Sequence, residues 1–285
     1  MMNENFLKKM FNSSKIPTID FGLADISKEA QKLAGKLSIA GVQPKLSVKL
    51  KKNSLIVVIE GGEYILKPQT PTFTNIPENE QCCMDIAEEL EIDVPAHCLL
   101  PLKDEILAYV VKRFDRKNGN KIHQEDFYQI LEAKDKYLGS AEQIGRKLKD
   151  ISSAPGLDVQ LFFERVVFYF LIGNGDAHLK NYSISYKENN IRLAPAYDIV
   201  CSKLVIPNEE DSAITINGKK NNLKRGDFDE LAEHFSIPIK VRYEKFEKKY
   251  DTIKKIIESS HIAKEKQTQF INLVKERAAR LQFLF

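Results

Sequence analysis

The hydrophobic pattern of the chain changes near residue 111, and this change constrains the fold more than any other feature. Before that point, short apolar runs alternate with polar residues and turn signals, which is typical of strands. Beyond it, apolar residues recur mostly at helical spacing. The sequence therefore predicts an α+β protein with a small strand-rich lobe over 1–111 and a larger helical lobe over 112–285.

The first lobe is expected to hold five strands and a helix. Pro77 suits the first turn of a helix, and acidic residues near its start favour a helix that continues to about Leu90. Gly61-Gly62 lies between two apolar runs, which predicts a hairpin at this point. Strands are expected over 45–50, 55–60, 63–68, 97–102 and 105–114, and a short helix over 27–33.

The second lobe is expected to be helical apart from one hairpin. The turn-prone KENN lies between YSISY and IRLA, so a hairpin is predicted over 182–194. The basic stretch 240–249 is interleaved with acidic residues, which favours a solvated helix face over a nucleic-acid contact. Helices are expected over 127–131, 140–148 and 159–172, and again from 227 to the C-terminus.

Composition excludes several classes of protein. Forty-three Lys and Arg against 40 Asp and Glu leave a charge of +3, too balanced to indicate direct DNA binding. The longest apolar stretch, 166–173, is far shorter than the roughly 20 residues that span a bilayer, and the N-terminus has no signal-peptide pattern. The 4 cysteines form no CxxC pair, so neither a disulfide framework nor a zinc site is indicated. A cytoplasmic protein without membrane contact is expected.

The segment GNGDAHLKN (173–181) is the most informative part of the sequence for function. It places Asp176 and Asn181 five residues apart, and Asp198 follows beyond the expected hairpin. Phosphoryl transfer needs a carboxylate that orients or deprotonates the attacking hydroxyl, and oxygen ligands that hold Mg²⁺ against nucleotide phosphates. The spacing therefore indicates Asp176 as a base and the other two residues as metal ligands.

The same segment also has a simpler structural interpretation. Asn-Gly and Gly-Asp pairs are common in turns, and the DxxxxN spacing alone would favour that interpretation. Three groups in this order, downstream of a strand-rich lobe, favour phosphoryl transfer instead. His178 and Lys180 lie inside the segment. A lone histidine is more often structural than catalytic, so His178 is expected to have a supporting role.

A nucleotide also requires a cation and a loop at its phosphates. Lys67 ends an expected strand, and Glu80 lies 13 residues later on the expected helix, as in a kinase-type lobe. The loop GKLSIAGVQPKLSV holds only Gly35 and Gly41, and it matches neither a Walker A motif nor GxGxxG. Taken alone, this loop is more typical of an ordinary connection before a strand.

Taken together, these segments resemble the HipA-like serine/threonine kinases, the toxins of bacterial toxin–antitoxin systems. The resemblance covers roughly residues 35–235 and depends on seven segments in the family's order. These segments are SIAGVQPKL (38–46), YILKP (64–68), NE (79–80), VKRFDR (111–116), IHQEDF (122–127), GNGDAHLKN (173–181) and LAPAYDIV (193–200).

The resemblance implies a bilobal, protein-kinase-like fold that uses ATP and Mg²⁺. It implies that Asp176 is the catalytic base, that Lys67 binds phosphate and that Ser38 is autophosphorylated to give an inactive state. The family's HipA toxins are acidic at the first hinge position, Lys112 here, but backbone groups usually hold adenine. The residues implied at the nucleotide are Ala40, Gly41, Val42, Gln43, Pro44, Lys45, Lys67, Lys112, Arg113, Phe114, His178, Lys180, Asn181, Tyr197 and Asp198. Of these, Asn181 and Asp198 are implied on Mg²⁺, and Glu80, Gln124, Glu125 and Asp126 are implied in support.

The resemblance also implies partners. Only 37 residues precede the first segment, so the chain is similar to the short HipT type, which lacks an N-terminal subdomain. A small HipS-like antitoxin and a helix-turn-helix HipB-like protein are then expected. The family's targets imply an aminoacyl-tRNA synthetase, tryptophanyl- or glutamyl-, as the substrate. Two alternatives remain: a small-molecule kinase of the aminoglycoside or choline type, and a pseudokinase that only binds partners.

Overall fold

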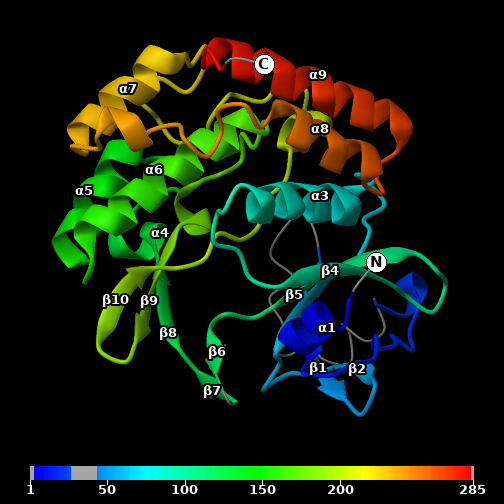
Figure 1. The fold of residues 1–285 in the computed structure, drawn as a ribbon. Helices are drawn as coiled ribbons and strands as arrows, with labels where there is room; N and C mark the ends of the chain where they lie inside the picture. Colours follow the sequence, from blue (N-terminus) through cyan, green and yellow to red (C-terminus); the bar gives the residue numbers. More distant parts are fainter. Residues whose placement is uncertain (1–2, 27–43, 118, 284–285) are drawn as a thin grey trace. The chain divides into compact units, whose positions relative to one another are not determined.

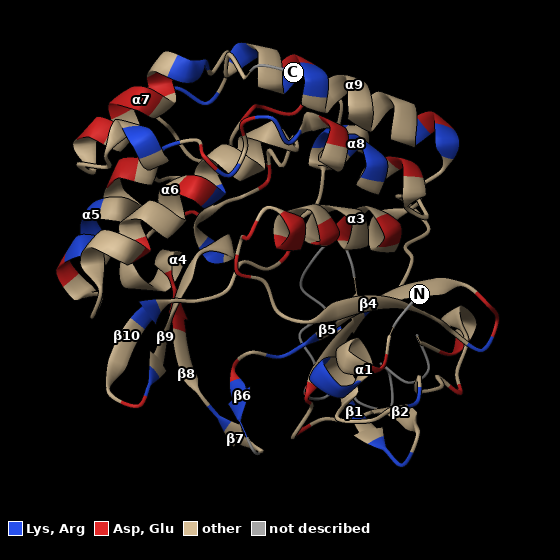
Figure 2. Cartoon of the chain, in the orientation of Figure 1, with Lys and Arg blue, Asp and Glu red and all other residues tan. Residues whose placement is uncertain are grey.

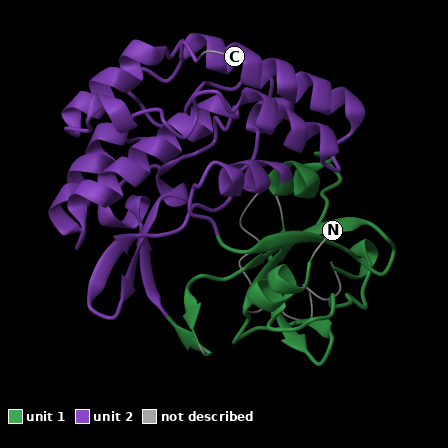
Figure 3. Cartoon of the chain, in the orientation of Figure 1, with its two compact units in different colours: residues 1–81, 95–121 green, residues 82–94, 122–285 purple. Residues whose placement is uncertain are grey.

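The computed structural model describes residues 3–26, 44–117 and 119–283, and it has the predicted α+β class. The chain forms two compact units, shown in Figures 1 and 3. One unit is built around a sheet and comprises residues 1–81 and 95–121. The other is mainly helical and comprises residues 82–94 and 122–285. The expected helix at 27–33 lies outside the described residues.

An antiparallel five-stranded sheet, with strand order β2-β1-β3-β5-β4, forms the centre of the first unit. The helix α1 (Glu4–Phe11) packs with this sheet, and α3 (Ile76–Glu89) begins in the same unit. A short ribbon, β6 (Arg116–Lys117) and β7 (Asn120–Lys121), follows. The sheet strands are β1 (Leu46–Lys51), β2 (Ser54–Val57), β3 (Tyr64–Lys67), β4 (His97–Pro101) and β5 (Leu107–Lys112).

The predicted hairpin at Gly61-Gly62 is wrong, because the strands that flank it do not pair with each other. β1 pairs with β2 through a tight turn at Lys52-Asn53, and β3 pairs with the other edge of β1. Gly62 is needed for a different reason. A Cβ atom there would lie 1.9 Å from Oγ of Ser47, so glycine allows the connection to cross close to β1.

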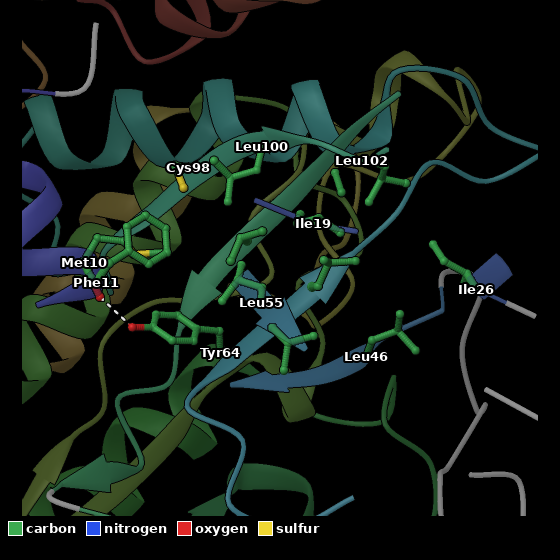
Figure 4. Packing of buried hydrophobic residues seen from close by; sticks show 14 of the residues in the cluster. Met10, Phe11, Ile19, Ile26, Leu46, Leu55, Tyr64, Cys98, Leu100 and Leu102 are labelled. Atoms are coloured by element: carbon green, nitrogen blue, oxygen red, sulfur yellow. Dashed lines mark hydrogen bonds between the residues drawn. The ribbon is translucent and has the colours of Figure 1, made fainter. Parts of the chain in front are cut away.

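The core of the first unit lies between its sheet and α1. Figure 4 shows Met10 and Phe11 beside Tyr64, whose hydroxyl donates a hydrogen bond of 3.0 Å to the carbonyl oxygen of Met10. The rings of Phe11 and Tyr64 have centroids 5.5 Å apart. A hydrogen bond also links the helix to the sheet: Nζ of Lys112, on β5, donates to the carbonyl oxygen of Lys9 near the end of α1 at 2.7 Å. The helix is therefore fixed to the sheet at its C-terminal end.

The second unit contains six further helices and a three-stranded sheet among its described residues. The predicted hairpin is confirmed as β9 (Ser183–Lys187) and β10 (Asn190–Leu193). A third strand, β8 (His123–Asp126), pairs with β9 and was not predicted, because its run is short and polar. The helices are α4 (Phe127–Ile130), α5 (Ala141–Ile151), α6 (Pro155–Leu171), α7 (Arg225–His234), α8 (Tyr250–Ser259) and α9 (Lys264–Arg280).

The prediction of a solvated helix face over 240–249 is wrong. Only a single 3-10 turn, Ile239–Val241, is helical at its start, and irregular turns follow up to α8. Tyr243 and Phe246 are buried, and Lys245 pairs with the buried carboxylate of Glu164 at 2.8 Å. The segment therefore packs within the helical unit through Tyr243, Phe246 and Lys245, while Lys240 and Lys248 are exposed.

A buried ion cluster joins α9 to the loop before α7. Asp211 accepts hydrogen bonds from Arg277 and Arg280, and both guanidinium groups also lie over the ring of Phe170. Burial alone would raise the pKa of Asp211, but the hydrogen bonds from Arg280 and Arg277 lower it below its usual value. The cluster therefore links α9 and the loop before α7 to Phe170 of α6.

All four cysteines are described, and all four are buried thiols outside any disulfide. Burial raises the pKa of Cys82 to about 12 and also raises that of Cys201. Within the described part of the chain, no helix combines the length and apolar character needed to cross a bilayer.

Candidate active site

The motif at 173–181 forms a tight loop directly after α6. Gly173 adopts a φ of 70°, a left-handed conformation that ends the helix. Gly175 has a different role, since a Cβ there would lie 2.4 Å from the carbonyl oxygen of Glu210. Its amide donates to Oγ of Ser202 at 2.8 Å. Both glycines are therefore required by the path of the backbone.

Asp176 is held by Tyr137, a residue that no sequence motif singled out. The hydroxyl of Tyr137 donates a hydrogen bond of 2.9 Å to Oδ1 of Asp176. Partial burial and this hydrogen bond raise the pKa of Tyr137 to about 12, so it remains a donor at neutral pH. One carboxylate oxygen of Asp176 is thereby engaged, and the carboxylate has a defined orientation.

The loop that carries Tyr137 is fixed to the 173–181 motif. The amide of Leu179 donates to the carbonyl oxygen of Lys136 at 3.1 Å, and Nζ of Lys136 lies 4.7 Å from the centre of the Tyr137 ring. A Cβ on Gly139 would lie 2.7 Å from the Leu179 side chain, so glycine permits this close packing. Tyr137 is therefore presented from a rigid surface.

His178, for which a supporting role is expected, contacts two other residues of the candidate site. Its ring packs edge-on against Tyr137, with centroids 5.3 Å apart, and its amide donates to Oδ1 of Asn181 at 3.1 Å. Burial lowers the pKa of His178, so the imidazole is neutral at neutral pH. His178 therefore contacts both Tyr137, which bonds to Asp176, and Asn181, a candidate metal ligand.

Tyr197 connects the two candidate metal ligands. Its hydroxyl donates to the carbonyl oxygen of Lys180 at 2.9 Å and also contacts Oγ of Ser183. Because Lys180 precedes Asn181 and Tyr197 precedes Asp198, this bond brings the two segments together. Asp198 has a φ of 56°, a left-handed conformation that is uncommon for residues other than glycine.

The oxygens of Asn181 and Asp198 suit Mg²⁺, which usually takes one or two protein ligands and completes its shell with phosphates and water. Within the described residues, no group of three His, Cys, Asp or Glu side chains could hold a metal alone. One amide oxygen and one carboxylate are two donors, which fits an ion that also takes phosphate and water ligands.

The first unit contains a buried ion pair of the kind expected for a phosphate-binding lysine. Nζ of Lys67, on β3, lies 2.5 Å from Oε1 of Glu80 on α3, and the two side chains are 5% and 1% exposed. Tyr109, the partner of Lys67 across β3 and β5, lies beneath the ammonium group at 5.5 Å. Figure 2 shows that α3 carries several acidic residues. The predicted pairing of Lys67 with Glu80 is present.

Other predicted nucleotide residues are engaged with neighbours or lie outside the described residues. The Lys112 side chain is bonded to α1, and Arg113 donates twice to Asp115, at 2.9 and 2.7 Å. Nζ of Lys180 lies 4.5 Å from the centre of the Tyr128 ring. Phe114, Pro44 and Lys45 are described, whereas Ser38, Ala40, Gly41, Val42 and Gln43 are not.

The three supporting residues of the HQED segment lie on β8, in the second unit. Glu125 accepts a hydrogen bond from the Tyr186 hydroxyl, and Gln124 is opposite Ser185 on β9. Asp126 caps α4, since its Oδ1 accepts from the amide of Gln129 at 2.9 Å. These contacts are structural.

Comparison with known proteins supports the resemblance. The model of the HipA-like C-terminal domain matches residues 37–271. A candidate kinase of Sinorhizobium fredii is 36% identical over 213 residues, which cover 67% of this chain and 51% of that protein. The serine/threonine-protein kinase toxin HipA of Shewanella oneidensis is 28% identical over 214 residues, with 64% and 47% covered. The chain spans about half the length of the curated relatives it matches.

Two solved structures share the fold. A chain of the Shewanella oneidensis HipA–HipB–operator DNA complex matches with a TM-score of 0.70 at 21% identity, covering 87% of this chain and 66% of that chain. The Helicobacter pylori proinflammatory kinase CtkA matches with a TM-score of 0.60 at 16% identity, covering 93% and 95%. The chain therefore belongs to the HipA-like C-terminal domain family and has the kinase-like fold of these proteins.

Proposed function

We propose that this chain is an ATP- and Mg²⁺-dependent protein serine/threonine kinase. The observation that carries the proposal is the hydrogen-bonded network of the second unit. In it Tyr137 holds Asp176, and Tyr197 ties the segment of Asn181 to that of Asp198. A base and two metal ligands on one fixed loop system are what phosphoryl transfer requires.

In the proposed reaction, Asp176 accepts the proton of a serine or threonine hydroxyl as that oxygen attacks the γ-phosphorus of ATP. The bond to the β–γ bridging oxygen breaks, and ADP leaves. Asn181 and Asp198 would hold Mg²⁺, which neutralises charge on the phosphates. Lys67, oriented by Glu80, is assigned to the phosphates, residues 40–45 to the loop over them, and residues 112–114 to the adenine.

Tyr137 is assigned as the residue that orients the base. Its hydrogen bond occupies Oδ1 of Asp176, which leaves Oδ2 for the acceptor hydroxyl. The surface behind Tyr137 is fixed by Lys136 and Gly139, so the carboxylate is presented in one orientation. Pre-organised groups of this kind act on the chemical step rather than on substrate binding.

Tyr137→Phe is expected to lower kcat by about tenfold while KM for ATP stays unchanged, because one hydrogen bond to the base is lost. Steady-state kinetics with a protein acceptor measures this split. The matched control is Tyr243→Phe, which removes a hydrogen bond of 2.8 Å to Asp229. The control should lower the melting temperature and leave kcat unchanged. Equal kcat values for wild type and Tyr137→Phe would remove the orienting role.

Gly175→Ala is expected to lower kcat by about 10- to 100-fold, since the new Cβ forces the loop away from Glu210 and displaces Asp176. The control is Gly156→Ala on α6, where nothing lies within 4 Å of the added atom. That variant should keep its activity. Circular dichroism melts of both variants distinguish a displaced loop from an unfolded protein.

We further assign this kinase to a toxin–antitoxin system. Support comes from the family membership and from the relative named as the toxin HipA, which is solved with HipB and operator DNA. The proposed substrate is an aminoacyl-tRNA synthetase, the proposed partners are HipS-like and HipB-like proteins, and autophosphorylation at Ser38 is proposed to switch the kinase off. Comparison of phosphoproteomes after induction of wild type and Asp176→Asn tests the assignment. Identical phosphosites in both would contradict it.

A further inference from the structure

A shallow groove of about 370 Å³ lies on the second unit between α5 and the loop that follows α4. One wall is apolar and consists of Leu131, Ala133 and Leu138. The other wall is the polar face of α5, with Arg146, Lys147 and Asp150. Because Leu138 directly follows Tyr137, one end of the groove lies next to the residue that bonds to Asp176.

The apolar wall is exposed although its backbone is fixed. Leu138 is 68% exposed, one of the most exposed large apolar side chains among the described residues. Its amide donates to the carbonyl oxygen of Asp135 at 3.2 Å, and the next residue, Gly139, packs tightly against Leu179. A leucine presented to solvent from a rigid loop beside a reactive carboxylate indicates a binding surface rather than a frayed segment.

The polar wall is equally well fixed and carries an excess of positive charge. The opposite face of α5 is buried, and a Cβ on Gly145 would lie 2.1 Å from the Phe235 ring, so the helix is pressed against that residue. Arg146 and Lys147 supply two cations against the single carboxylate of Asp150. Nη1 of Arg146 lies 3.5 Å from Nε2 of His234, a contact that does not neutralise the charge of the guanidinium group.

We propose that this groove binds the segment of the protein substrate that flanks the phosphorylated serine or threonine. The segment places an apolar side chain against Leu131, Ala133 and Leu138, and an acidic side chain against Arg146 and Lys147. Leu138 directly follows Tyr137, whose hydroxyl bonds to Asp176, so the apolar contact lies at the end of the groove nearest the acceptor. This inference rests on the proposed kinase function and specifies the acceptor sequence that it selects.

The test uses the full chain, Mg²⁺–ATP and a positional-scanning library of peptides with one central serine or threonine. Wild type should favour peptides that combine Asp or Glu with Leu, Ile, Met or Phe near the acceptor. Arg146→Glu/Lys147→Glu should reverse the charge preference and lower kcat/KM for acidic peptides by about tenfold, while KM for ATP is unchanged. Leu138→Ser should lower kcat/KM for apolar-flanked peptides by about tenfold.

Each variant has a matched control on the same unit. Lys254→Glu/Lys255→Glu introduces the same change of charge on α8, and Leu157→Ser removes an apolar side chain that is 51% exposed at the start of α6. Both controls should keep the wild-type peptide preference. A library profile that is unchanged in the groove variants would overturn the docking groove.

Two further outcomes separate this inference from the proposed function. If wild type phosphorylates a protein acceptor but no peptide, or peptides without any flanking preference, the groove is rejected and the kinase assignment stands. If wild type transfers phosphate to no acceptor, including itself, the kinase assignment fails and the groove fails with it. A loss of transfer of about 10²–10⁴-fold in Asp176→Asn confirms that the measured activity belongs to this site.

Discussion

Asp176→Asn is expected to lower the rate of phosphoryl transfer by about 10²–10⁴-fold, the contribution that a general base makes to such reactions. The amide keeps the size of the carboxylate and can still meet the hydroxyl of Tyr137, but it does not accept a proton from the acceptor. ATP binding should persist, since its contacts are assigned to other residues. Transfer of ³²P from labelled ATP, together with calorimetric titration of Mg²⁺–ATP, measures both quantities.

The control for this prediction is Asp198→Asn. That change removes a proposed metal ligand, so it should weaken nucleotide binding in the presence of Mg²⁺ and have little effect in its absence. Substantial transfer by Asp176→Asn would exclude Asp176 as the base. Equal ATP affinity of Asp198→Asn and wild type, with Mg²⁺ present, would exclude Asp198 as a ligand.

Asp211→Asn is expected to have the largest effect on stability, about 3–5 kcal/mol, because it removes the buried counter-ion of Arg277. Arg277 is 2% exposed, so water does not replace the lost interaction, and its other pair is with the exposed carboxylate of Glu276 at 3.3 Å. The melting temperature should fall by about 6–15 °C. Differential scanning calorimetry on the full chain measures this loss.

Glu258→Gln provides the comparison, since it breaks an exposed pair with Lys254 and should change stability by less than about 1 kcal/mol. Acid should have the same effect as the Asp211 substitution. The pKa of Asp211 is lowered by folding, so its stabilisation is complete above the unfolded value of about 3.9 and is lost as the pH falls through the folded value. Equal acid sensitivity of wild type and Asp211→Asn below pH ~4 would contradict this origin.

Strands and helices with clear periodicity could be predicted from the sequence. The runs around Leu46–Lys51 and Leu107–Lys112 alternate or are wholly apolar, and the stretch at Pro155–Leu171 is apolar enough to indicate a buried helix. Which strands pair with each other was less predictable. The Gly61-Gly62 signal is local, whereas the choice of partner for β3 depends on which edge of β1 is free.

Elements stabilised mainly by distant residues were not predictable. The strand β8 is polar, and it forms because it pairs with the edge of β9. The conformation of the 240–249 segment follows from the burial of Tyr243 and Phe246 rather than from its charges. Neither of these causes leaves a periodic signal in a single sequence. Tertiary contacts therefore override local pattern in both places.

The residues of the candidate site also differ in how far they could be predicted from the sequence. Asp176 and Asn181 lie in one short motif, so their proximity could be predicted, although their roles stay predictions. Tyr137 is 39 residues upstream of Asp176 and belongs to no motif that the chemistry of the site would require. Only the folded chain brings its hydroxyl to the carboxylate.

The reactivity of the buried cysteines can report local unfolding of the native chain. A thiol reacts with an alkylating reagent only as an exposed thiolate; burial removes the exposure of all four, and it also raises the pKa of Cys82 and Cys201. Cys98 belongs to the sheet unit, whereas Cys82, Cys83 and Cys201 belong to the helical unit. The rate at which each cysteine gains the mass of iodoacetamide therefore reports how often its own unit unfolds, without any substitution in the chain.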